Sequence, residues 1–238
     1  MRAHVPCYVA VVSVGMALLF GPAASASLIE NHSITVNDSG SNFVAGAWGE
    51  FSLPQFDDWG GTRILEAVTL RVRADFFGGS NSLDSESLFA GTASVMIGSG
   101  LFVDAPLSLS VSLVQPSESS GDMAVTADDE AGFPDFVDAG GGDDCVSVAG
   151  QDVTDVQSIA LTNPPDDLSA YIGSGTITIS FSSSITSMAS ATVGPTWAYV
   201  DAPTFCFDAE IIYTYVPEPG TMSVLALGGL AIVRHRQK

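Results

Sequence analysis

The chain has 238 residues, of which 27 are acidic and only seven are lysine or arginine, so its formal net charge at pH 7 is −20. Such a charge repels phosphate backbones and anionic lipid surfaces, which excludes nucleic acid as an expected partner. Only three of the basic residues lie between the two ends of the chain, whereas every acid except Glu218 does, so the central region is more acidic still.

The first 26 residues have the three parts of a secretion signal. Arg2 is the charged residue before an apolar run from Val9 to Phe20, and the small residues Ala24 and Ala26 follow it. The run is shorter than the roughly 20 apolar residues that cross a bilayer. We therefore predict a signal helix that engages the secretion machinery and is removed by cleavage between Ala26 and Ser27.

Residues 27–216 are predicted to form one antiparallel all-β domain. Apolar and polar residues alternate along Val68–Phe76, Leu107–Leu113 and Ile177–Ser182, which is the period of a strand with one solvated face. The last strand, 205–215, has apolar residues at its odd-numbered positions, and Cys206, Asp208 and Glu210 face the other way.

Weaker strand signals are separated by turns rich in Gly, Ser, Asn and Asp. They lie at Ser33–Val36, Ala93–Val103, Asp122–Ala127, Val146–Val148, Val156–Leu161 and Trp197–Val200. About eight to ten short strands separated by such turns favour a two-sheet sandwich or jelly roll.

A segment from Asp122 to Asp144 is rich in acids and glycine and contains no basic residue. A hard cation with oxygen ligands would relieve the repulsion between the carboxylates. We therefore consider a calcium site, and its candidate ligands are Asp128, Asp129, Glu130, Asp143 and Asp144. The EF-hand spacing is absent, and a solvated acidic loop that confers solubility is the alternative.

Two cysteines, Cys145 and Cys206, remain once the signal and its Cys7 are removed. An even pair in an oxidising compartment favours a disulfide over a catalytic thiol. Closing a loop of this length would stabilise the fold by up to about 4 kcal/mol. We expect this bond, and the alternative is two unpaired buried thiols.

The central region offers little catalytic machinery. His32 is its single histidine, and it has no G-x-S-x-G, H-E-x-x-H or C-x-x-C pattern. A carboxylate pair is all that glycoside hydrolysis needs, but an abundance of acids is not evidence for one. We predict a non-enzymatic protein.

Carbohydrate binding is an alternative function for the domain. Trp48, Trp59 and Trp197 could form a platform on which sugars stack, although such residues more often pack in the core or at the rim of a sandwich.

The C-terminus has its own three-part pattern. Pro217-Glu218-Pro219-Gly220 precedes an apolar stretch, Thr221–Val233, and a basic end that contains Arg234, Arg236 and Lys238. The prolines end the preceding strand. The apolar stretch reaches only about 20 Å as a helix, short of a bilayer core of about 30 Å. We expect a short apolar helix that associates transiently with the membrane, with the basic residues as a stop.

This terminus resembles the PEP-CTERM sorting signal of bacterial envelope proteins, through Pro217-Glu218-Pro219, the segment Leu225–Leu230 and the basic end. The resemblance implies recognition and cleavage near the tripeptide by an exosortase, which is a membrane protease. A glycolipid-anchor signal is the rival interpretation, but such a signal normally ends in its apolar segment.

The central domain resembles choice-of-anchor E domains, through Leu53–Asp57, Tyr171–Thr176 and Ile212–Tyr215. That resemblance implies a surface location and no known activity. The sequence therefore predicts an exported cell-surface or extracellular-matrix protein that is an exosortase substrate. The alternative is an extracellular β-sandwich module that binds calcium or carbohydrate, with an extracellular polysaccharide as partner.

Overall fold

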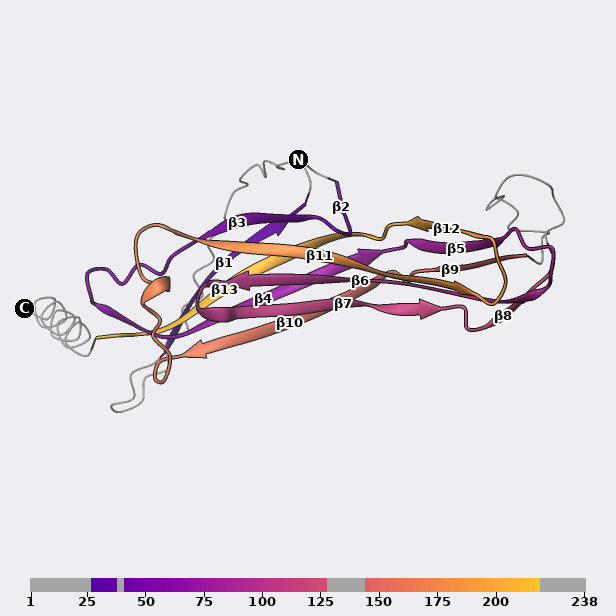
Figure 1. The fold of residues 1–238 in the computed structure, drawn as a ribbon. Helices are drawn as coiled ribbons and strands as arrows, with labels where there is room; N and C mark the ends of the chain where they lie inside the picture. The colour runs from indigo at the N-terminus through magenta and orange to yellow at the C-terminus, as the bar shows by residue number, and fades with distance from the viewer. Residues whose placement is uncertain (1–26, 38–40, 128–143, 219–238) are drawn as a thin grey trace, which may run out of the picture.

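The computed structural model describes residues 27–37, 41–127 and 144–218, and these residues form an elongated all-β molecule (Figure 1). The predicted signal helix and C-terminal helix lie outside the described residues. None of the described residues belongs to a helix long and apolar enough to cross a membrane. The strands are β1 (Leu28–Val36), β2 (Phe43–Val44), β3 (Trp48–Pro54), β4 (Arg63–Phe77), β5 (Ser80–Ser85), β6 (Gly91–Ala105), β7 (Leu109–Ser119), β8 (Met123–Val125), β9 (Cys145–Ala149), β10 (Val153–Thr162), β11 (Thr176–Ala191), β12 (Thr196–Asp201) and β13 (Thr204–Pro217).

Two antiparallel sheets pack face to face around the main core. Sheet I has the order β1-β13-β4-β10, with β2 paired to β13, and sheet II has the order β3-β11-β6-β7, with β8 paired to β6. Alternate residues of each strand point between the sheets, because successive side chains of a strand face opposite ways. In β13 the odd-numbered residues from Phe205 to Tyr215 are all buried, as the alternation predicted.

Aromatic rings fill much of the space between the sheets. Phe205 of sheet I stacks on Phe43, and Phe207 meets Phe181 of sheet II edge to face at 5.2 Å between ring centroids. Fully burying a side chain of this size contributes roughly 1.5–3 kcal/mol. The sandwich is therefore held by the alternating apolar residues that the sequence displays.

A third sheet extends the molecule beyond the main core. Sheet III has the order β12-β5-β9, and a smaller core lies between it and the far ends of β6 and β8. The chain passes from β4 to β5 through Gly78 and Gly79, and from β12 to β13 through Ala202 and Pro203. Sheet III lies at the opposite end of the long axis from the C-terminal end of β13 (Figure 1).

The structure confirms the antiparallel sandwich and extends several predicted strands. The segment predicted at Ala93–Val103 belongs to the 15-residue β6, and that at Ile177–Ser182 belongs to the 16-residue β11. The prediction that a strand begins at Leu107 is wrong. Leu107 lies in a short 3₁₀ turn, η1 (Pro106–Ser108), with a positive φ of 63°, and β7 begins two residues later.

Candidate functional site

The start of the predicted processed chain lies at the edge of the described residues. Ser27 is exposed, and its hydroxyl donates a hydrogen bond to the Glu66 carboxylate at 2.9 Å. Ala24 and Ala26 lie outside the described residues, so the cleavage position stays a prediction. At the other terminus Pro219, Gly220 and the basic residues Arg234, Arg236 and Lys238 also lie outside them.

The first two residues of the predicted sorting motif continue the last strand. Pro217 is the final residue of β13 and pairs with Arg63, the first residue of β4. The next backbone N–H, that of Glu218, donates a hydrogen bond to the carbonyl of Thr62 at 3.0 Å. The strand therefore ends at Pro217, the first of the two prolines predicted to end it, and the chain leaves the domain at the end where β4 begins.

Arg63 is the centre of a packed cluster beside this exit. Its guanidinium lies 4.4–4.6 Å from the ring centroids of Phe56, Trp59 and Tyr215. It also forms an ion pair at 2.9 Å with Glu30 of the edge strand β1. Glu30 in turn contacts the buried ring of His32 at 3.1 Å. The histidine that any catalytic triad would have required thus packs against a carboxylate on its own strand.

The predicted disulfide is not present. Cys206 of β13 lies opposite Asp75 of β4, whereas Cys145 of β9 lies opposite Asp84 of β5. The two cysteines therefore belong to different sheets, on either side of the Gly78–Gly79 connection, and a disulfide needs facing Cβ atoms. Burial raises the pKa of the Cys206 thiol, and the neighbouring carboxylates of Asp75 and Asp208 raise it further.

The calcium hypothesis falls almost entirely outside the described residues, since Asp128, Asp129, Glu130 and Asp143 are not among them. Asp144 is described and buried, and its backbone carbonyl accepts a hydrogen bond from the Ser85 N–H at 3.2 Å. Over residues 27–37, 41–127 and 144–218 no group of three or more metal-ligating side chains gathers. A calcium site in the acidic loop therefore stays a prediction.

The three tryptophans of the predicted carbohydrate platform are exposed but lie apart in the fold. Trp59 stacks on Arg63 beside the chain exit, and Trp197 belongs to β12 of sheet III. Trp48, which is 64% exposed, starts β3 at the edge of sheet II. Only Trp48 therefore lies on a broad sheet face that a long ligand could follow.

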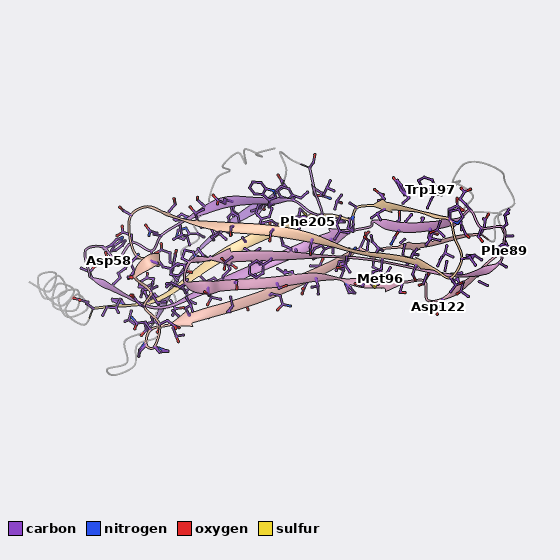
Figure 2. All side chains as sticks on the ribbon, viewed as in Figure 1. Asp58, Phe89, Met96, Asp122, Trp197 and Phe205 are labelled. Carbon is purple, nitrogen blue, oxygen red and sulfur yellow. The ribbon has the colours of Figure 1, made fainter. Side chains whose placement is uncertain are left out.

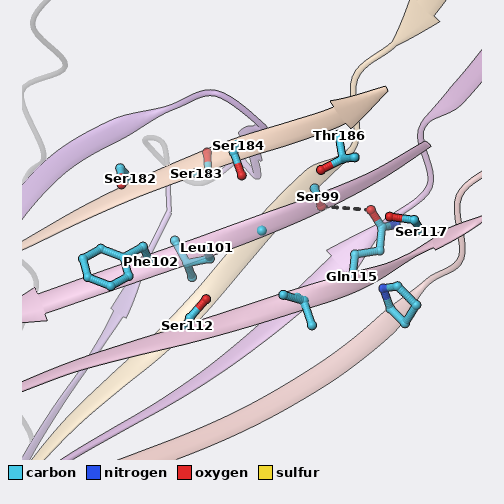
Figure 3. A pocket seen from close by; sticks show the side chains of 13 residues that line it. Ser99, Leu101, Phe102, Ser112, Gln115, Ser117, Ser182, Ser183, Ser184 and Thr186 are labelled. Atoms are coloured by element: carbon cyan, nitrogen blue, oxygen red, sulfur yellow. Dashed lines mark hydrogen bonds between the residues drawn. The ribbon is translucent and has the colours of Figure 1, made fainter. Parts of the chain in front are cut away.

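That outer face of sheet II carries a groove of about 420 Å³ over β11, β6 and β7 (Figure 3). Gly100 of β6 forms its floor, because the missing side chain leaves a depression between neighbouring strands. Phe102, which is 46% exposed, stands at one end. The outward-facing residues that line the groove are Gly100, Phe102, Ser112, Val114, Pro116, Ser182, Ser184 and Thr186.

The strand register places an aromatic residue on either side of Ser182. Trp48 pairs with Ser182, Ser182 pairs with Phe102, and Phe102 pairs with Ser112, so one row crosses β3, β11, β6 and β7. Neighbouring strands lie about 4.8 Å apart, which sets the backbones of Trp48 and Phe102 about 10 Å apart. Two exposed rings therefore flank a hydroxyl on one face.

The sheet beneath the groove is braced from the inside. Ser99 donates a hydrogen bond to the side-chain oxygen of Gln115 at 2.9 Å (Figure 3). The amide nitrogen of Gln115 donates to the carbonyls of Gly78 and Gln151, at 3.1 and 2.6 Å. These buried contacts fix β6 against β7 and link both to the connection between sheets I and III.

Sequence reasoning missed Phe102, although a signal was present. Leu101-Phe102-Val103 is an unbroken apolar run inside β6, as is Val95-Met96-Ile97. A half-buried strand places the middle residue of such a run in solvent. The run was compatible with a strand, but nothing in it showed which neighbouring strands would lie beside the exposed ring.

No protein-family model and no curated protein matches this sequence. Among solved structures, the T13 particle of infectious bursal disease virus (IBDV) gives a TM-score of 0.23 at 10% identity, covering 87% of this chain and 45% of that chain. The VP2 subviral particle of that virus gives 0.19 at 9% identity, covering 86% and 42%. This chain spans less than half of each, and likenesses at this level carry no argument about function.

Proposed function

We propose that this chain is an exported, non-enzymatic protein of the cell surface or extracellular matrix. Its first 26 residues direct it to the secretion machinery, and the tail that starts at Pro217 is a sorting signal cut by an exosortase-type membrane protease. The tail associates with the membrane only transiently, because its apolar stretch is too short for a lasting span.

The observation that carries the proposal is the position of the tripeptide relative to the folded domain. Proline, glutamate and proline follow the last strand directly, ahead of an apolar stretch and a basic end. Glu218 keeps a backbone hydrogen bond to Thr62, and its side chain is exposed. A protease could therefore remove the tail without cutting within the folded sandwich.

The shape of the domain supports display at a surface. The chain leaves at the end of the long axis where Asp58 lies, and Trp197 of sheet III and Phe89 of the β5–β6 connection lie toward the other end (Figure 2). An elongated domain attached at one end presents its long faces and its far end away from the attachment. The strong negative charge keeps such a domain soluble outside the cell.

The test is the intact mass of the protein recovered from the envelope and from the medium of the producing cells. We expect an N-terminus at Ser27 and a C-terminus near Pro217–Gly220. Glu218→Ala should leave the tail uncut while preserving the fold, because alanine keeps the backbone N–H that binds Thr62. Asp201→Ala, another exposed acid, is the matched control and should be processed normally. A soluble cytosolic chain that retains Met1 and Lys238 would overturn the proposal.

A further inference from the structure

The outer face of sheet II differs in chemistry from one end to the other. Near sheet III the hydroxyls of β6 and β11 pair with each other, as Ser94 does with Ser190 at 2.9 Å. In the groove, by contrast, hydroxyls that face solvent make no hydrogen bond with other described residues. These are the hydroxyls of Ser112, Ser182, Ser184 and Thr186.

Each of these hydroxyls is both a donor and an acceptor, so the groove presents a set of uncharged, two-way hydrogen-bonding groups. Phe102 and Trp48 place exposed rings on either side of one member of this set, Ser182, with their backbones about 10 Å apart by strand spacing. Rings offer a flat apolar surface, and the apolar face of a pyranose is its natural counterpart. Few ligands other than a sugar chain present apolar faces edged with hydroxyls.

The charge of this sheet face further restricts the class of ligand that can bind. All three basic residues among the described ones, Arg63, Arg71 and Arg73, belong to β4 in sheet I. The acids Glu50 and Asp104 lie in the register row next to Phe102, across β3 and β6. A polymer of uronic acids, sulfated sugars or phosphates would be repelled here, and no cation is placed to receive it.

We propose that the groove over Gly100, with Phe102 and Trp48 at its end, is a binding site for a neutral polysaccharide chain. Its volume falls in the range of about 300–1,000 Å³ typical of ligand sites, enough to hold part of a chain while the rest runs along the open face. This inference deepens the proposed function by giving the displayed domain a ligand class. The binding itself does not depend on export, which decides only that the protein meets the polysaccharide outside the cell.

The test is native affinity electrophoresis of the purified full chain in gels that contain hydroxyethyl cellulose, dextran, galactomannan or xyloglucan. We expect at least one neutral polymer to retard the protein, and polygalacturonate not to. Phe102→Ala and Trp48→Ala should each weaken binding at least tenfold. The controls Trp197→Ala in β12 and Phe89→Ala in the connection between β5 and β6 remove exposed rings away from the groove and should bind as the parent does.

A groove-filling variant keeps the test independent of the loss of a ring. Gly100→Val adds a side chain whose Cβ meets the Ser184 hydroxyl at 3.4 Å and no backbone atom closer than 3.6 Å, so it should fold and still abolish binding. Three results would overturn the proposal. The first is that none of the four neutral polymers retards the protein. The second is equal retardation of the parent and the groove variants. The third is a dimer, seen by light scattering, that Phe102→Ala converts to a monomer. None of these results bears on tail processing, which the mass measurement tests separately.

Discussion

The guanidinium of Arg63 lies 2.9 Å from the carboxylate of Glu30, across the sandwich end at which the chain leaves the domain. The pair joins the first residue of β4 to the edge strand β1, and three aromatic rings surround the arginine. The pair is largely shielded from solvent, since the side chain of Arg63 is 9% exposed and that of Glu30 is 18% exposed. A charge pair in such surroundings is costly to break, because the remaining charge stays poorly solvated.

Arg63→Ala should lower the free energy of unfolding by about 2–4 kcal/mol, through loss of the Glu30 pair and of the ring contacts. Arg71→Ala is the matched control. Arg71 is 56% exposed and lies 3.8 Å from Glu210, so its removal should change stability by less than about 1 kcal/mol. Urea unfolding of both variants measures the difference, and equal losses would show that the cluster has no special role.

Alkaline pH should destabilise the domain through two buried phenols. Burial is the main cause that raises the pKa of Tyr213 and of Tyr171 well above the ordinary value of 10.0. As the pH rises, the tyrosines of the unfolded chain therefore ionise before those of the folded chain. The contribution of the two phenols to stability is complete below about pH 10 and is lost as the pH rises above it. Phenolate absorbance should show that both residues ionise only as the chain unfolds.

Tyr213→Phe separates the phenol from the ring. The variant loses the hydrogen bond that the hydroxyl donates to the carbonyl of Pro54 at 2.8 Å, at a cost of about 1 kcal/mol near neutral pH. Above pH 10 its stability should fall less steeply than that of the parent, because one of the two buried phenols is gone. Unfolding free energies at several alkaline pH values test this, and parallel curves would contradict it.

Gly79 should be intolerant of any side chain. Its φ is +88°, and a Cβ there would approach the ring of Pro203 to 2.6 Å at the connection between sheets I and III. Gly46 has a similar φ of +97° with nothing within 4 Å of the added atom, which makes it the control. Gly46→Ala should cost about 1 kcal/mol from backbone strain. Gly79→Ala should cost about 1–3 kcal/mol more, and thermal unfolding of the pair isolates that contact.

The two cysteines should behave as thiols in the processed protein. A thiol reagent should count both in the denatured chain without prior reduction, and a reductant should leave the melting temperature unchanged. In the folded protein Cys206 should react more slowly than in the unfolded chain, because burial and the Asp75 carboxylate disfavour the thiolate. Thiols that appear only after reduction would restore the disulfide interpretation.

The strong alternation in β4 and β13 was enough to predict antiparallel strands and the side of each that faces the core. The strands β2, β3 and β5 were not predicted. Ser80–Ser85 of β5 is mostly polar, yet it is buried, because the Asn81 amide donates to the carbonyls of Met96 and Met188 at 2.8 Å. Long-range hydrogen bonds of this kind override local propensity, and no local pattern encodes them.

The sequence by itself determined an acidic central region whose apolar residues repeat with a period of two, and it predicted a removable signal at each end of the chain. That information is local, because charge, apolar run length and alternation are properties of neighbouring residues. Only the tertiary structure decided that Cys145 and Cys206 lie in different sheets, and that Trp48 and Phe102 flank Ser182. Both depend on register between strands distant in the chain, which is set by the packing of the whole sandwich.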